Sequence, residues 1–185
     1  MLRRHNALIV HFSGAPPGSS FGAPSYPTDL HDVIGRKAKS GLACSVVMPT
    51  DNFHSPGVRN AFGCIGVIVG LTSPNSLMAV DPGDAGSFCM NGVRHYPDRD
   101  ITVADLDSTI LQRVEHNEWG VSDYRVLGIL AVPPFEIWDH RPPGTLTQTT
   151  VSQVQREFAP LTVYGFHGGV MISPTGAISA GTLYP

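Results

Sequence analysis

The sequence is poor in charge, in cysteine and in long apolar runs, and each shortage excludes a class of protein. Charged residues make up 15% of the 185 residues and the formal net charge is −3, which argues against the cationic surface that binds nucleic acid or anionic membranes non-specifically. The first apolar run, Ala7 to Val10, is too short for a signal-peptide core or a membrane span. Cys44, Cys64 and Cys89 are too few and too widely spaced for a disulfide scaffold or a zinc knuckle. We therefore expect a cytoplasmic protein that does not bind membranes, with export by a specialised secretion system as the alternative.

Familiar metal and phosphate motifs are also missing. The eight histidines form no HxH, HxxxH or HExxH pair, which would place two ligands on one element, so we expect no dedicated metal site. Neither a P-loop nor a GxGxxG turn after a strand occurs, so a nucleotide would have to bind without these loops. Asp81 and Asp84 lie among glycines in "DPGDAGS", which favours a plain turn over a cation site.

The residues that are abundant predict a globular fold of short elements. Hydrophobic residues make up 42% of the chain, enough for one core over residues 1–185, and 20 glycines and 16 prolines imply many turns. We predict a single α+β domain with a core of short, mostly antiparallel strands and two or more short helices. The predicted helices cover residues 28–41 and 102–116, and the predicted strands are 7–12, 43–48, 63–71, 76–80, 124–132 and a terminal hairpin that turns at 174–176.

Two places in this pattern combine apolar runs with polar groups. The first predicted strand ends in His11 and Ser13, directly before a loop rich in Gly and Pro over residues 14–27. His11 is either a strand-end histidine bonded to backbone or the edge of a ligand pocket. Glu118 follows the apolar stripe of the second helix and precedes Trp119, which we expect to be buried. Glu118 is accordingly either an exposed helix-end residue or a carboxylate with a function.

The order of these elements resembles a known family. "VHFS" has a strand-end histidine with a hydroxyl two residues later, "DLHDVIGRKAKSGL" has an amphipathic helix pattern, Arg59 precedes a buried strand, and "NEWGV" contains Glu118. In this order the chain resembles the ADP-ribosyltransferase fold, and most closely the DNA ADP-ribosyltransferase toxins of the DarT type. The family's "VPP" turn occurs here in "AVPPFEI" after a longer spacer, which makes Glu136 a second candidate for the catalytic glutamate. The resemblance implies a transferase core over residues 7–138 and a C-terminal strand extension over 145–185.

This resemblance implies an NAD-dependent ADP-ribosyltransferase of toxin or effector type. Such an enzyme moves ADP-ribose from NAD to a macromolecular acceptor, protein or nucleic acid, and has an antitoxin or immunity protein as a partner. Glu118 would stabilise the positive charge that develops on the ribose, and Arg59 would hold the pyrophosphate or the acceptor. His11 and Ser13 would bind NAD in the same cleft as Glu118. An aromatic side chain would pack against the nicotinamide ring, and the candidates are Phe53, Phe62 and Tyr96.

Two other classes of function stay open at this point. Cys44 could form a Cys–His hydrolase with His95 or His116, because a thiolate–imidazole pair needs proximity in space and not in sequence. Cys44 nevertheless lies in an apolar strand pattern, where a free cysteine is commonly a small buried hydrophobic residue. The third possibility is a non-catalytic protein-binding or immunity-type domain whose Gly- and Pro-rich loops form the interface.

Overall fold

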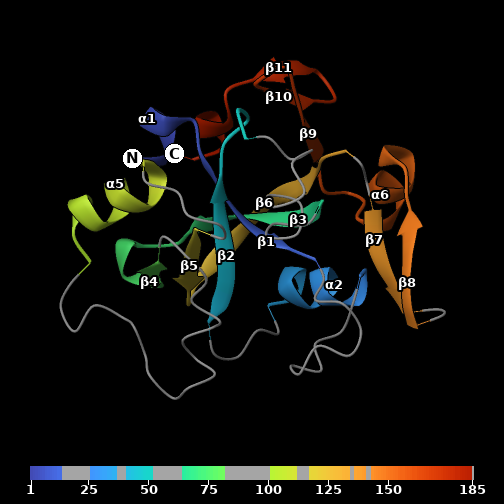
Figure 1. Ribbon diagram of the computed structural model, residues 1–185, viewed down its shortest axis with the longest axis horizontal. Coiled ribbons are helices and arrows are strands. Elements are labelled where there is room, and N and C mark those ends of the chain that lie inside the picture. The colour runs from blue at the N-terminus through green and yellow to red at the C-terminus, as the bar shows by residue number, and fades with distance from the viewer. Residues whose placement is uncertain are drawn as a thin grey trace.

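A nine-stranded mixed sheet forms the centre of the computed structural model (Figure 1). The structure describes residues 1–13, 26–36, 41–51, 64–81, 101–111, 117–133, 136–140 and 143–184, and of residues 81, 108, 111, 136–140 and 143–148 the backbone only. Neighbouring strands pair antiparallel except β6 and β9, which are parallel. The strand order is β11 (Gly176–Ile178), β10 (Val170–Ser173), β9 (Val163–His167), β6 (Tyr124–Ala131), β3 (Ile65–Leu71), β1 (Leu8–Phe12), β2 (Leu42–Val47), β5 (Glu118–Val121) and β4 (Leu77–Asp81).

The helices of the described residues are short, and a separate hairpin completes the fold. The hairpin is a two-stranded sheet outside the main one, at the end of the molecule that carries α6 in Figure 1. The molecule is thus a single α+β domain, and the coarse fold prediction is confirmed. The remaining elements are α1 (Leu2–His5), α2 (Thr28–Ile34), α5 (Val103–Leu111), α6 (Val151–Glu157), β7 (Glu136–His140), β8 (Pro143–Gln148) and 3-10 turns at Pro74–Ser76 and Ala180–Leu183.

β1 divides the hydrophobic core into two parts, one on each face of the sheet. Successive side chains of a strand point to opposite faces, and Ala7, Leu8, Ile9 and Val10 are all fully buried. Ile9 contacts the larger cluster, which also contains residues of α2, α5 and α6, and we call this side the helix face. Leu8 and Val10 contact the smaller cluster, which contains residues of the C-terminal segment, and we call this side the terminal face.

The two ends of the chain meet on the terminal face. Arg3 Nε donates a hydrogen bond of 2.9 Å to the carbonyl oxygen of Tyr184, and the labelled termini lie together in Figure 1. The hydroxyl of Tyr184 accepts a 2.7 Å hydrogen bond from the backbone N–H of Ile9. The C-terminal segment therefore satisfies a buried donor of the central strand as well as covering its apolar side chains.

Most of the predicted strands are present. β2, β3, β4 and β6 match the predicted ranges to within two residues at each end, and β10 and β11 form the predicted terminal hairpin. The start of α5 also matches. The backbone N–H of Thr102 donates to the carboxylate of Asp105 at 2.7 Å, and the backbone N–H of Asp105 donates to the hydroxyl of Thr102 at 3.3 Å.

Two predictions of local structure are wrong. α2 ends at Ile34 and does not continue to Gly41, because Arg36 has a left-handed backbone with φ of 55°. Residues 145–156, where no helix is predicted, contain part of β8 and all but the last residue of α6. The signal for α6 was present in the sequence: Thr150 accepts a hydrogen bond from the backbone of Gln153, whose side chain bonds back to Thr150 N at 2.8 Å.

Gly66 of β3 approaches β1 so closely that a side chain does not fit. A Cβ built on Gly66 would lie 2.6 Å from the carbonyl oxygen of His11 and 2.6 Å from Cγ1 of Val10. We expect Gly66→Ala to lower the free energy of unfolding, measured by urea denaturation, by about 1–3 kcal/mol through overpacking. The control is Gly70→Ala on the same strand, where the nearest atom is the flexible Leu127 Cδ1 at 3.1 Å, and its loss should be smaller. Equal losses in the two variants would contradict this packing.

Candidate functional site

Glu118 is the first residue of β5 and is half-buried on the terminal face of the sheet. The next residue, Trp119, is 2% exposed and belongs to the core of the helix face, so alternation turns Glu118 to the opposite side. The pairing of β5 with β2 agrees, because Trp119 lies opposite Cys44 of the helix-face core and Glu118 lies opposite Ser45. The expected burial of Trp119 is therefore confirmed, and Glu118 is a strand residue and not a helix-end residue.

Several small residues lie near Glu118 on its side of the sheet, although its direct partner on β4 is Asp81. Gly120 is two residues further along β5 and lies between Ala43 of β2 and Ala79 of β4. The atoms nearest to a Cβ built on Gly120 belong to Ala79 and Met78, both in the neighbouring strand. We call this surface the Glu118 face; it consists of Ala43, Ser45, Ala79, Glu118 and Gly120.

His11 lies on the helix face, because it is two residues after Ile9 in β1. Its ring Nδ1–H donates a 2.7 Å hydrogen bond to the carbonyl oxygen of Ala43. Desolvation lowers the pKa of His11, although the bond to Ala43 and the charge of Asp29 act in the opposite direction. This geometry is that of a strand-end histidine bonded to the backbone of the neighbouring strand.

Ser13 connects the end of β1 to the start of α2. Its hydroxyl donates a 2.8 Å hydrogen bond to one carboxylate oxygen of Asp29, whose other oxygen accepts from the backbone N–H of Leu30 at 2.8 Å. The backbone N–H of Ser13 donates to the carbonyl oxygen of Ile65 at 2.8 Å. The hydroxyl and the backbone N–H of Ser13 thus both serve the local structure.

The expectation that His11 and Ser13 share a cleft with Glu118 is wrong. His11 lies on the helix face and Glu118 on the terminal face, so the sheet itself separates the two side chains. The physical reason is the strand register. His11 lies beside Cys44 of β2, whose side chain is on the helix face, whereas Glu118 lies beside Ser45, the next residue of β2, whose side chain is on the terminal face.

Of the other candidate residues that the structure describes, Asp81 lies beside Glu118 and Glu136 does not. Glu136 begins β7 and pairs with Gln148 in the two-stranded sheet, so it belongs to a different sheet from Glu118. Asp81, considered for a cation site, ends β4 opposite Glu118 in the register. The predictions that lie outside the described residues concern Phe53, Arg59, Phe62, Asp84, His95, Tyr96 and His116.

Cys44 is a poor candidate for a nucleophile. It is 2% exposed, and burial, followed by the charge of Glu118, raises the pKa of its thiol far above neutrality. A hydrolase needs a thiolate that a substrate can reach. The environment of Cys44 therefore favours the interpretation as a small buried hydrophobic residue.

The part of the chain that the structure describes was compared with the requirements of a metal site and of a membrane-spanning helix. Within it, no three or more His, Cys, Asp or Glu side chains are grouped so that they could hold a metal ion. The described helices are also too short to cross a membrane.

Searches against family models, curated proteins and solved structures find no match to this chain. The assignment of function consequently depends on the geometry of its own residues.

The lowered pKa of His11 makes stability depend on pH. As the pH falls below the ordinary histidine value of 6.5, the unfolded chain binds the proton at His11 before the folded chain does, so folding loses free energy. We expect the free energy of unfolding of the wild type to fall more steeply between pH 7 and pH 5 than that of His11→Gln, whose amide can still donate to Ala43. The measurement is urea denaturation at each pH, and identical slopes would show that His11 is not desolvated.

The burial of Cys44 predicts that its thiol does not react in the native protein. At pH 8, a colorimetric thiol reagent should label native wild type and native Cys44→Ala at the same rate and to the same extent. In urea, the variant should lose one of the three thiols of the chain. Loss of a fast-reacting native thiol in Cys44→Ala would restore the hydrolase hypothesis.

Proposed function

We propose that the chain is an NAD-dependent ADP-ribosyltransferase in which Glu118 is the catalytic carboxylate and the Glu118 face holds the nicotinamide–ribose part of NAD. The observation that carries the proposal is the position of Glu118, half-buried at the head of β5 among small side chains. A glutamate at the head of a strand is also what the resemblance to the ADP-ribosyltransferases implies. The sequence resemblance and the single α+β domain both support the proposal.

The reaction needs one well-placed carboxylate more than it needs any other group. The bond between the nicotinamide nitrogen and the ribose C1′ breaks, and nicotinamide leaves with the bonding electron pair. The positive charge that develops on the ribose is stabilised by an adjacent carboxylate, which can also accept a hydrogen bond from the ribose 2′-hydroxyl. A lone pair of the acceptor then forms the new bond to C1′, and the proton of the acceptor passes to the carboxylate or to solvent. Glu118 would perform these carboxylate functions.

The surroundings of Glu118 suit a sugar and a flat ring. Ser45 lies opposite Glu118 in the register and is half-buried, so its hydroxyl would be within the same surface as the carboxylate. Gly120 and Ala43 add little side-chain bulk near the carboxylate. His11 and Ser13 are not part of this proposed centre, because His11 lies on the helix face and the hydroxyl of Ser13 is bonded to Asp29 of α2.

The biological role follows the same proposal. The acceptor is a macromolecule, protein or nucleic acid, and the enzyme acts as a toxin or effector that an antitoxin or immunity protein restrains. The net charge of −3 disfavours an acceptor that requires extended contact with duplex DNA.

The test is release of nicotinamide from NAD together with transfer of labelled ADP-ribose to proteins and nucleic acids of a cell extract. We expect Glu118→Gln to lower both rates by about 100-fold or more, because it removes the charge while keeping the shape. The matched control is Glu157→Gln, which changes an exposed glutamate of α6 that pairs with His31 at 2.7 Å. The control should retain full activity.

Binding of NAD gives an independent measurement. NAD at about 100 times its dissociation constant should stabilise the folded protein by roughly 2.7 kcal/mol, visible as a higher melting temperature. A wild type that neither releases nicotinamide nor shifts its melting temperature with NAD would overturn the proposal. Equal activity of Glu118→Gln and wild type would remove Glu118 from the catalytic centre.

A further inference from the structure

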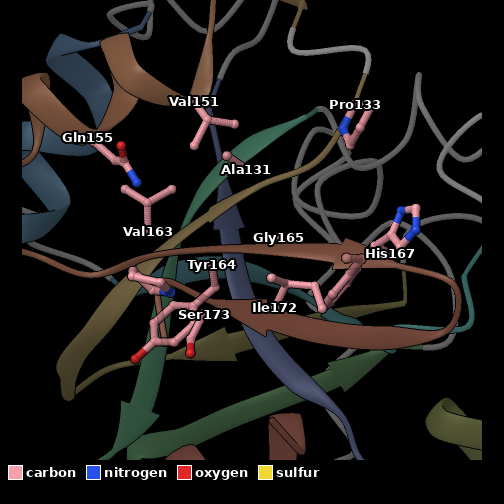
Figure 2. Close-up of a pocket in the computed structure, with 12 residues that line it drawn as sticks. Ala131, Pro133, Val151, Gln155, Val163, Tyr164, Gly165, His167, Ile172 and Ser173 are labelled. Carbon is pink, nitrogen blue, oxygen red and sulfur yellow. The ribbon is translucent and has the colours of Figure 1, made fainter. Parts of the chain in front are cut away.

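A cavity of about 270 Å³ lies between α6 and the strands β9 and β10. Val151 and Gln155 reach it from α6, Val163, Gly165 and His167 come from β9, and Ile172 comes from β10 (Figure 2). Val163 belongs to the helix-face core and Ile172 lies opposite Gly165, so the cavity is on the helix face. No sequence motif marks these residues, because they come together only when the C-terminal strands join the main sheet.

Gly165 leaves one wall of the cavity without a side chain. A Cβ built on Gly165 would meet a single atom within 4 Å, the carbonyl oxygen of Ala131 at 3.3 Å. The space above this glycine is thus open, and the bare peptide backbone offers a flat floor between Val163 and Ile172. A flat molecule can lie against such a floor, whereas a branched one would leave part of it uncovered.

The lining is mainly apolar, and its polar residues are Gln155, Tyr164, His167 and Ser173. Among the described residues that line it there is no lysine, arginine, aspartate or glutamate, so an ionised ligand would lose hydration without a charged partner from them. Gln155 and His167 lie at opposite ends of the lining in Figure 2, where each can form a hydrogen bond with the edge of a ligand. The chemistry of the cavity therefore selects for an uncharged ligand with a polar edge.

We propose that this cavity is a binding site for an uncharged aromatic molecule of one or two fused rings that carries a hydrogen-bonding group at its edge. A volume of 270 Å³ exceeds the roughly 150 Å³ of a cavity that binds benzene and falls below the roughly 300–1,000 Å³ of sites for drug-sized ligands. The ring rests on Gly165 between Val163 and Ile172, and Gln155 or His167 binds its polar edge.

This site is separate from the Glu118 face. Four strands, β6, β3, β1 and β2, lie between β9 and β5 in the sheet, and the cavity and Glu118 are on opposite faces. A single NAD molecule could not place one ring in the cavity and its ribose at Glu118, because the sheet lies between the two places. Ligand binding in the cavity is therefore independent of the proposed transferase activity.

The experiment titrates the full chain, carrying ¹³C-labelled valine and isoleucine methyl groups, with indole, which has two fused rings and an N–H at its edge. We expect saturable shifts at Val151, Val163 and Ile172, and intermolecular nuclear Overhauser effects from indole to Val163 and Ile172. Indole-3-acetate has the same rings and a carboxylate, and it should bind at least fivefold more weakly because the lining offers no cation. An absence of saturable shifts with indole, or equal affinity for the two probes, would overturn the proposal.

A pair of matched variants tests the place of binding. Val151→Trp at the rim of the cavity should weaken indole binding at least tenfold, because the larger side chain occupies the space of the ligand. Val170→Trp changes a valine of β10 that is outside the lining and similarly exposed, 43% against 38% for Val151, and should bind like the wild type. Glu118→Gln should also bind indole like the wild type. Unchanged binding in Val151→Trp would contradict the site, and if that variant fails to fold, the Overhauser effects in the wild type decide.

Discussion

The burial of β1 on both of its faces is the constraint on which the rest of the structure depends. Ala7 to Val10 expose no surface, so apolar material must cover both sides of the central strand. α2, α5 and α6 contribute the core of one side, and the C-terminal segment contributes to the core of the other. The close approach of Gly66 to β1 and the hydrogen bond from Ile9 to Tyr184 follow from the same crowding. The last residues of the chain are for this reason as much a part of the core as the first strand.

The two-sided core also determines which face of the sheet each polar side chain reaches. A polar residue in a strand that is covered on both sides reaches only the face to which its position in the alternation assigns it. His11 and Glu118 are close in strand order but fall on opposite faces, and each is engaged with different neighbours. The helix face holds the cavity beside α6, while the Glu118 face is formed by small residues near the edge strand β4. Two surfaces with different properties, one a carboxylate among small side chains and the other an uncharged apolar cavity, result from one sheet.

Elements with strong local signals could be predicted from the sequence, and elements defined by their partners could not. β3 was predictable because seven successive residues are apolar or glycine, and the start of α5 was predictable because Thr102 and Asp105 have the spacing of a capping box. α6 has the same kind of cap at Thr150, but its few apolar residues made the segment resemble a loop. Its stability as a helix comes from Val154 and the adjoining Phe158, which are buried against the sheet.

By itself, the sequence determined that this is a globular α+β protein with short strands, that Trp119 is buried, and that Glu118 stands out as a carboxylate beside an apolar segment. Only the tertiary structure decided which of the polar residues share a surface. That decision depends on strand register, and a difference of one residue along β2 moves a side chain through the sheet to the other face. The cavity beside Gly165 likewise depends on the pairing of β9 with β6 and with β10. No local sequence pattern indicates these pairings.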